Sequence, residues 1–403
     1  MFANLPSKAR HAETLANAFD PTRNAFGLFR FALAALVIVS HCYPLGGFGR
    51  DPLEVVTAGR LSLGLFAVAM FFVLSGFLIT RSASRTSAVR FLWHRFLRIF
   101  PGYWVCLVVC AFILAPMICQ VEYTHAYRIF AAPHDSPQLY LAGNFAMLHL
   151  NHWSISGVMN VSPQSIGKTL HLNPYPFVFN GSIWTLPYEL ICYLTVGLLA
   201  VVGVVRRARH VVLLLFVAGW ALYASNWLVP SLFHHLLPFR CMAELLMLVT
   251  YFFAGAVCFL YREKIAFSAA PLGVSAIALA CALPNRWFGV VAPITMPYLF
   301  LWFATKVPFH RFDTHRDYSY GLYIYAFPVQ QALAFFRIQG EGFAIYLASA
   351  LLLSTLFAIF SYHLIEAPCL RLKNIDLRAV IAKLRARRRG IDITAPALDS
   401  SAF

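Results

Sequence analysis

Charged residues are scarce in this sequence. Asp, Glu, Lys and Arg make up only 12% of its 403 residues, against about 25% in an ordinary soluble domain. Hydrophobic residues make up 60%, and the mean hydropathy is +0.69. This balance excludes a plain cytosolic enzyme, a disordered chain, a collagen and a coiled coil. No Cys-x-x-Cys motif occurs among the nine cysteines, so we predict neither a disulfide framework nor a metal site.

The apolar residues gather into ten runs, each about long enough for a helix to cross a bilayer of about 30 Å. The runs cover residues 26–44, 62–80, 100–119, 182–204, 210–229, 241–260, 266–283, 288–305, 318–337 and 343–365. A transmembrane β-barrel has shorter segments of alternating hydrophobicity. The sequence therefore predicts an all-α, polytopic integral membrane protein with about ten transmembrane helices.

Positive charge is distributed unevenly between the loops. With the ten runs as spans, 24 of the 32 Lys and Arg residues lie on one side, 7 lie on the other, and Arg30 lies within the first run. The positive-inside rule predicts that the richer side, which carries both termini, is cytoplasmic. Residues 1–25 then form a cytoplasmic segment, 26–372 the membrane domain and 373–403 a basic cytoplasmic tail. Because no aromatic residues interleave the cations of the tail, we expect it to bind anionic lipid and not nucleic acid.

One segment on the opposite, periplasmic side is unusually long. Residues 120–181 are rich in Pro, Asn, His, Tyr and Trp, and a structureless loop of this length usually has a function. Its aromatic and amide side chains suit stacking on, and hydrogen bonding to, a sugar or a polar headgroup. A lid that only plugs the bundle is an equally good interpretation.

Two ionisable residues lie in the first run, where each is costly unless it faces a cavity or a partner. Arg30 and His41 are eleven residues apart, so they share one helix face at a separation of about 16 Å. A snorkelling arginine or an interfacial histidine would explain either residue alone. The shared face favours a channel with a cation near its inner end and a titratable base near its outer end.

Further charged residues are expected close to these two. We expect Glu189 about 10 Å below the outer surface, just after Pro187, which should kink the helix. Its partner would be His41 or an arginine, with a structural ion pair as the alternative. Arg95 and Arg98 share one helix face. Their guanidinium groups suit the phosphates of a nucleotide-like donor, and anionic lipid headgroups equally well.

Taken in order, the motifs of this chain resemble the membrane acyltransferase 3 family, whose members O-acylate bacterial surface glycans. The resemblance covers about residues 24–372. The matching motifs are Arg30-x10-His41, the Phe71–Leu78 run, Arg95-x-x-Arg98 before Phe100-Pro101, Trp184-x-Leu186-x-x-Glu189, the Ser319–Tyr325 run and Glu366-x-Pro368.

The resemblance implies an acyltransferase for groups other than amino-acyl groups, in the bacterial inner membrane. Its acyl group, commonly acetyl, comes from acetyl-CoA as a substrate and goes to a hydroxyl of a surface polysaccharide, a lipopolysaccharide or a lipid-linked sugar. No cofactor stays bound. His41 would be the catalytic base, Arg30 would support the donor channel, and Arg95 and Arg98 would help to bind the donor. The spacing of the residues, and not the resemblance, predicts that Glu189 acts in the same catalytic pocket as His41. Possible pocket residues are Trp184, Ser319, Tyr320 and Tyr323.

A glycolipid or polysaccharide transporter, or a flippase, is the main alternative. Such a protein would share the spans, the intramembrane charges and the polar loop. The sequence shows neither a duplicated half nor a pair of broken helices, which are typical of many transporters. A second type of membrane acyltransferase, with its histidine deep in a longer bundle, fits the position of His41 in the first run less well.

Overall fold

The computed structural model of the protein describes residues 13–123, 125–160, 173–236, 241–310, 312 and 316–375. The first part of the predicted N-terminal segment, residues 161–172 of the long loop and nearly all of the basic tail lie outside this range. Within it the regular elements are all helical, and the only β-type pairing is an isolated bridge between Thr14 and Ala266.

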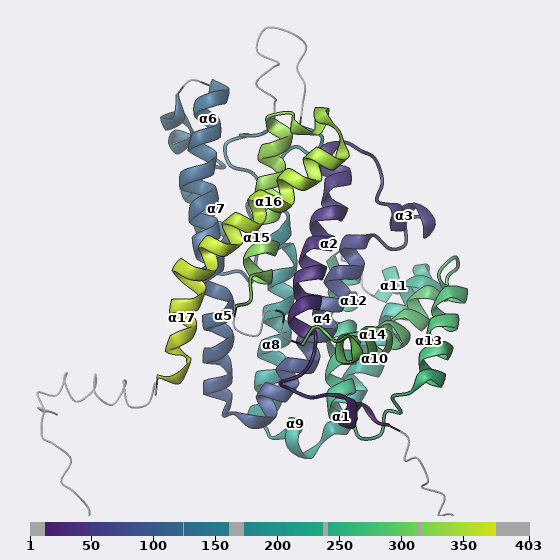
Figure 1. The fold of residues 1–403 in the computed structure, drawn as a ribbon. Helices are drawn as coiled ribbons and strands as arrows, with labels where there is room; N and C mark the ends of the chain where they lie inside the picture. The colour runs from purple at the N-terminus through teal and green to yellow at the C-terminus, as the bar shows by residue number, and fades with distance from the viewer. Residues whose placement is uncertain are drawn as a thin grey trace, which may run out of the picture.

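Every predicted run coincides with a helix (Figure 1). The main helices are α2 (Phe26–Gly46), α4 (Leu63–Arg85), α5 (Ala88–Val109), α8 (Leu186–Val201), α10 (Arg209–Leu228), α12 (Cys241–Leu260), α13 (Ala269–Ala282), α14 (Phe288–Lys306), α15 (Ser319–Phe335) and α16 (Phe343–Ser361). Shorter helices are α1 (Leu15–Ala18), α3 (Pro52–Val56), α6 (Ala115–Tyr123), α7 (Pro137–Asn144), α9 (Val204–Arg207), α11 (Pro230–Leu236) and α17 (Ala367–Arg371). The 3₁₀ turns are Ala126–Ala131, Ser182–Thr185, Ile338–Glu341 and Leu372–Asn374.

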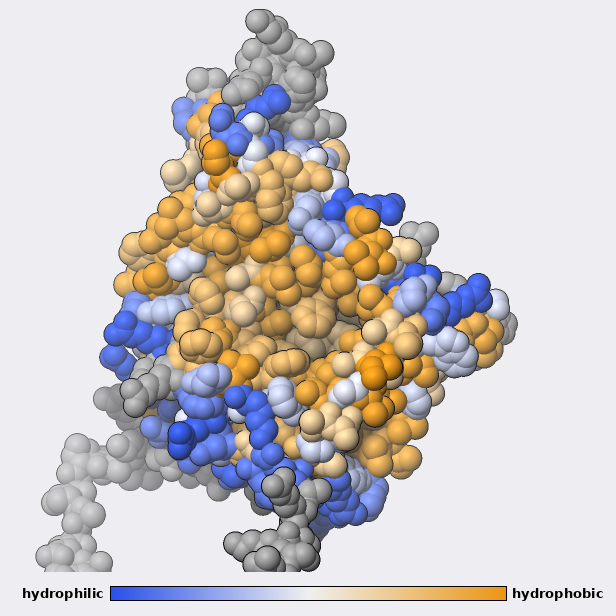
Figure 2. All heavy atoms as spheres, turned by 45° about the vertical axis from the view of Figure 1, so that its right-hand side comes forward, coloured by the Kyte–Doolittle hydropathy of each residue, from blue (hydrophilic) through white to orange (hydrophobic). Residues whose placement is uncertain are grey.

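Among the described residues, eight helices are long and apolar enough to cross a membrane. The two other predicted spans are shorter, because α13 has 14 residues and α15 has 17. Figure 2 shows a broad apolar surface around the middle of the molecule, with hydrophilic residues gathered toward its two ends. The chain is therefore an all-α, polytopic membrane protein, and α1 and α17 lie toward the same end of the bundle (Figure 1). That this end is cytoplasmic stays a prediction from the loop charges.

Three local expectations were wrong. The third span begins at Ala88 instead of residue 100 and continues through a π-helical turn to Tyr123, so Arg95 and Arg98 lie inside a helix. Pro187 does not kink a helix but lies in the first turn of α8. The N–H groups of a first turn make no hydrogen bond within the helix, so a proline there costs none. The long outer segment is also not structureless, since it contains α7 and a 3₁₀ turn.

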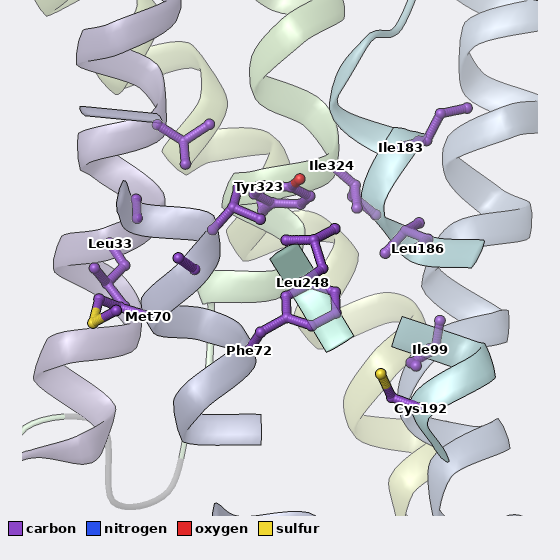
Figure 3. Close-up of a cluster of buried hydrophobic side chains, with 14 of the residues drawn as sticks. Leu33, Met70, Phe72, Ile99, Ile183, Leu186, Cys192, Leu248, Tyr323 and Ile324 are labelled. Atoms are coloured by element: carbon purple, nitrogen blue, oxygen red, sulfur yellow. The ribbon is translucent and has the colours of Figure 1, made fainter. Parts of the chain in front are cut away.

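Helix α15 lies in the centre of the half of the bundle that holds the predicted site. Fifteen of its 17 residues are buried, and it packs against α2 and α16. Figure 3 shows part of the surrounding core, where Leu33, Met70, Leu186 and Tyr323 come from four different helices. Its burial on all sides explains why α15 carries polar side chains that lipid would not tolerate.

The closest helix crossing is between α4 and α12. A methyl group added to Gly76 would lie 1.8 Å from the backbone oxygen of Phe252, and one added to Gly255 would lie 2.0 Å from that of Val73. Small residues allow backbones in membranes to approach in this way. Gly76 therefore has a packing role in the contact between α4 and α12.

We predict that Gly76→Ala strongly lowers the stability of the protein. No side chain can move aside to make room, because the obstacle is backbone, and overpacking of this kind typically costs about 1–3 kcal/mol. Gly273→Ala in α13 is the matched control, since nothing lies within 4 Å of a methyl group there. Thermal unfolding in detergent should show a lower midpoint for Gly76→Ala alone. Equal midpoints for the two variants would contradict the proposed close crossing.

Candidate active site

A cavity of about 140 Å³ lies between α2, α4, α5, α8 and α15. Its polar lining comes from Arg30, Ser75, Arg95, Arg98, Thr185, Glu189, Tyr193, Ser319, Tyr320 and Tyr323, and the rest of its wall is apolar. We call it the arginine cavity. It brings together seven residues that the sequence assigned to the site from four separate motifs.

The arginine cavity is held at one end by a cluster of buried charges. One carboxylate oxygen of Asp317, Oδ2, lies 3.1 Å from Nη1 of Arg30 and also accepts a hydrogen bond from Nη2 of Arg98. The other oxygen accepts hydrogen bonds from the backbone N–H and the hydroxyl of Ser319. On its far side Arg98 lies 3.8 Å from Glu366. Asp317 thus connects α2, α5 and the start of α15.

The charge of Asp317 depends on these two cations. Its side chain is only 14% exposed, and burial by itself raises the pKa of a carboxyl. The positive charges of Arg30 and Arg98 outweigh that effect and hold the pKa of Asp317 well below its usual value. The residue is therefore an anion whenever the protein is folded near neutral pH.

Arg95 differs from the other two arginines of the cavity. In the described part of the chain no carboxylate lies within ion-pairing distance of it. Its guanidinium carbon lies 6.0 Å from the ring centres of both Phe91 and Tyr193. Of the three cavity arginines, Arg95 has the least compensated positive charge.

Glu189 lines the arginine cavity. Its hydrogen-bond partner is Tyr193, and not His41 or an arginine as we expected. Its carboxylate accepts a hydrogen bond from the hydroxyl of Tyr193, which in turn accepts one from Ser75 at 3.1 Å. Arg95 and Arg98 are the cations whose charges act on it. The structure thus groups Glu189 with the arginines and gives it no contact with His41.

Three of the lining side chains contact one another at the end of the cavity away from Asp317. The hydroxyls of Thr185 and Tyr323 lie 2.8 Å apart, within hydrogen-bonding distance. The ring of Phe71 meets that of Tyr323 edge-on, with ring centres 6.1 Å apart. We call these three side chains the partition, and His41 is not among the residues that line the cavity.

His41 lies beyond this partition, toward the other end of α2. Its ring packs edge-on against Phe327, with centres 5.4 Å apart, and Phe327 follows Tyr323 by one turn of α15. Arg30 pairs with Asp317, directly before α15, so both residues face this part of the chain and the predicted shared face is confirmed. The Nδ1 atom of His41 is buried and has no hydrogen-bond partner among the described residues.

The four predicted pocket residues divide into two groups. Ser319, Tyr320 and Tyr323 line the cavity, and Tyr320 also donates a hydrogen bond to the carbonyl of Ile99 at 2.8 Å. Trp184 does not line it and packs edge-on against Tyr188.

Sequence reasoning missed four polar residues of the site: Ser75, Thr185, Tyr193 and Asp317. Tyr193 follows Glu189 by one helical turn, and Asp317 directly precedes the run of hydroxyl residues that starts α15, so both had a local signal. No group of three or more His, Cys, Asp or Glu side chains in the described ranges could hold a metal ion.

We predict that Asp317→Asn destabilises the protein by about 3 kcal/mol near neutral pH, because it leaves the partly buried guanidinium groups of Arg30 and Arg98 without the anion that they share. The pKa of Asp317 is lowered on folding, so its contribution is complete above about pH 4, the usual pKa of an aspartate, and is lost as the pH falls below that value. The unfolding midpoints of wild type and variant should therefore converge on acidification.

The control for this prediction is Glu13→Gln, which breaks the exposed pair between Glu13 and Lys306. An exposed pair contributes little, so this variant should unfold like the wild type at each pH. Equal stability of Asp317→Asn and the wild type at pH 7 would show that the charge cluster does not support the fold.

Comparison with known proteins gives a consistent result. The chain is 29% identical over 356 residues to an O-acetyl transferase of Shigella phage Sf6, a match that covers 85% of this chain and 93% of the relative. It is 25% identical over 375 residues to nodulation protein 10 of Rhizobium leguminosarum bv. viciae, covering 87% and 94%. No solved structure matches. The profile of the acyltransferase domain Acyl_transf_3 matches residues 23–363, so this membrane protein belongs to the acyltransferase 3 family.

Proposed function

We propose that the protein is an O-acetyltransferase that takes an acyl group from acyl-CoA, in the first place acetyl-CoA, on the cytoplasmic side of the bacterial inner membrane. It passes the group to a hydroxyl of a surface glycan or a lipid-linked sugar on the other side. One observation carries this proposal. One bundle holds a cavity lined by three arginines and, outside its lining, a histidine whose Nδ1 has no hydrogen-bond partner among the described residues.

The arginine cavity fits the anionic end of the donor. A planar guanidinium group suits a phosphate because it can donate two parallel hydrogen bonds. Arg95 carries the least compensated charge, so we assign it the main contact with a donor phosphate. Arg30 and Arg98, both held by Asp317, line the same cavity and present their remaining N–H groups.

His41 fits the role of general base for the acceptor. A neutral imidazole with an unpaired ring nitrogen can accept the proton of a hydroxyl. As the acceptor hydroxyl transfers its proton to His41, its oxygen bonds to the thioester carbonyl carbon. The C–S bond then breaks, and the coenzyme A thiolate leaves and takes up the proton from the imidazolium. The products are an O-acyl sugar and coenzyme A.

The two parts of this site are separated by the partition of Phe71, Thr185 and Tyr323. Tyr323 and Phe327 are four residues apart, so the distance from the partition to the level of His41 is about 6 Å along α15. The acyl end of the donor has to pass the hydrogen-bonded pair of Thr185 and Tyr323 to reach His41. Glu189 lies on the donor side of the partition, and we assign it to the electrostatics of the arginines.

We predict that His41→Ala lowers acyl transfer by about 10²- to 10⁴-fold, the usual contribution of a general base, while coenzyme A still binds. The measurement is transfer of labelled acetyl from acetyl-CoA to surface polysaccharide that mild alkali has stripped of its esters. His149→Ala, at an exposed histidine of the outer segment, is the matched control. Near-normal transfer by a well-folded His41→Ala protein would refute the assignment.

We predict that Arg95→Ala weakens the binding of coenzyme A to the purified protein by tenfold or more. Arg95→Lys should restore only part of the affinity, because a lysine keeps the charge but lacks the planar fork. Arg90→Ala removes an exposed arginine from the same helix and should bind coenzyme A as the wild type does. Wild-type affinity in Arg95→Ala would instead mean that this arginine faces anionic lipid.

A further inference from the structure

The outer end of α15 carries a short segment of the long loop, residues 173–181. The side-chain amide of Gln331 donates hydrogen bonds to the carbonyls of Tyr175 and Val178, both at 2.6 Å. The amide of Asn180 donates to the carbonyl of Ile324 at 3.0 Å. The segment is thus fixed on the helix that separates the arginine cavity from His41.

Two aromatic rings, those of Tyr175 and Phe327, connect this segment to His41. Tyr175 meets Phe327 edge-on with ring centres 6.0 Å apart, and Phe327 meets His41 edge-on at 5.4 Å. Tyr175 is 45% exposed, whereas Phe327 is only 5% exposed. The row therefore begins at the surface and ends at the proposed base.

Buried polar atoms without a partner lie on the residues around this row. Among the described residues they include Oδ1 of Asn173, Oε1 of Gln330 and the hydroxyl of Ser182, and all three residues are buried. The amide nitrogen of Gln330 donates to the carbonyl of Ile38, one turn before His41 and Cys42. Unsatisfied polar atoms in the interior are costly, so three of them beside one row of rings point to a ligand with several hydroxyl groups.

Ser182 is connected to the same row through its neighbour. A methyl group added to Gly181 would lie 2.5 Å from the ring of Phe327, so the backbone of this turn lies directly on that ring. Only a glycine allows the approach. The turn that begins α8 and the aromatic row therefore form one wall.

We propose that Tyr175, supported edge-on by the buried ring of Phe327, forms a stacking platform for a sugar ring of the acceptor, with the polar groups of Asn173, Ser182 and Gln330 beside it for the sugar hydroxyls. This inference rests on the proposed function and names the acceptor side of the same site. Apolar and aromatic walls with a few placed polar groups are typical of small-molecule sites. A pyranose ring has an apolar face for the rings and hydroxyls for the carbonyl oxygens and the serine. One of those hydroxyls then reaches His41.

The test compares Tyr175 with a second exposed aromatic residue of the same segment. Phe177 is 63% exposed and has no ring contact with the row, so Phe177→Ala is the matched control. Binding of the alkali-treated surface polysaccharide, cut to oligosaccharides, is followed by saturation-transfer NMR on protein in lipid nanodiscs. Labelled acetyl transfer at increasing oligosaccharide concentration is measured on the same samples.

We expect Tyr175→Ala to raise the half-saturating oligosaccharide concentration about fivefold, in line with the loss of one aromatic contact. Tyr175→Leu, which keeps an apolar side chain, should show the same loss, whereas Tyr175→Phe and Phe177→Ala should stay within about twofold of the wild type. If Tyr175→Ala is too unstable to purify, the comparison of Tyr175→Leu with Tyr175→Phe decides.

Equal binding by Tyr175→Leu and Tyr175→Phe would overturn the platform, as would an equal loss in Phe177→Ala. A parallel loss of coenzyme A binding in the Tyr175 variants would also overturn it, because the tyrosine would then only support the fold. Wild-type protein that binds the oligosaccharides at Tyr175 but never transfers acetyl would instead refute the proposed function and leave the platform standing.

Discussion

The site depends on one shared anion. An arginine within a membrane-spanning helix is costly unless it has a partner, and this bundle places two such residues, Arg30 and Arg98, beside each other. Asp317 compensates both through a single carboxylate oxygen and is itself held by Ser319. The three charges come from α2, α5 and the chain just before α15. The ion pairs that compensate the two arginines therefore also hold these three helices together around the cavity.

Much of the fold could be predicted, because a transmembrane helix is specified locally by the length of an apolar run. The shared face of Arg30 and His41 could be predicted for the same reason, since it follows from the helical period alone. The partner of Arg30 could not, because Asp317 lies far along the chain and its position depends on which helices become neighbours. The partner of Glu189 is Tyr193, one turn further along the same helix, and there the helical period alone could have found it. The effect of Pro187 could not be predicted either. A proline kinks a helix when it lies in the interior, but it is tolerated in the first turn, and the sequence did not show that α8 begins at Leu186.

The arrangement separates two chemical tasks that the acyltransferase family combines in one chain. The arginines, Glu189 and Asp317 occupy one side of the partition, where charge can be compensated by charge. His41 lies on the other side against the ring of Phe327, and none of the ion pairs in the described part of the chain includes it. In the proposed reaction, its separation from the charge cluster would leave its ring free to exchange a proton with the acceptor.

The length of α15 has a consequence for the distance that an acyl group has to travel. Seventeen residues span about 26 Å, less than the hydrocarbon thickness of a bilayer, and other helices shield nearly all of its surface from lipid. A helix this short, enclosed by its neighbours, leaves little height between the charge cluster at its start and the loop segment at its end. For the proposed reaction, a donor arm and an acceptor hydroxyl that enter from opposite sides would need only a short overlap to meet.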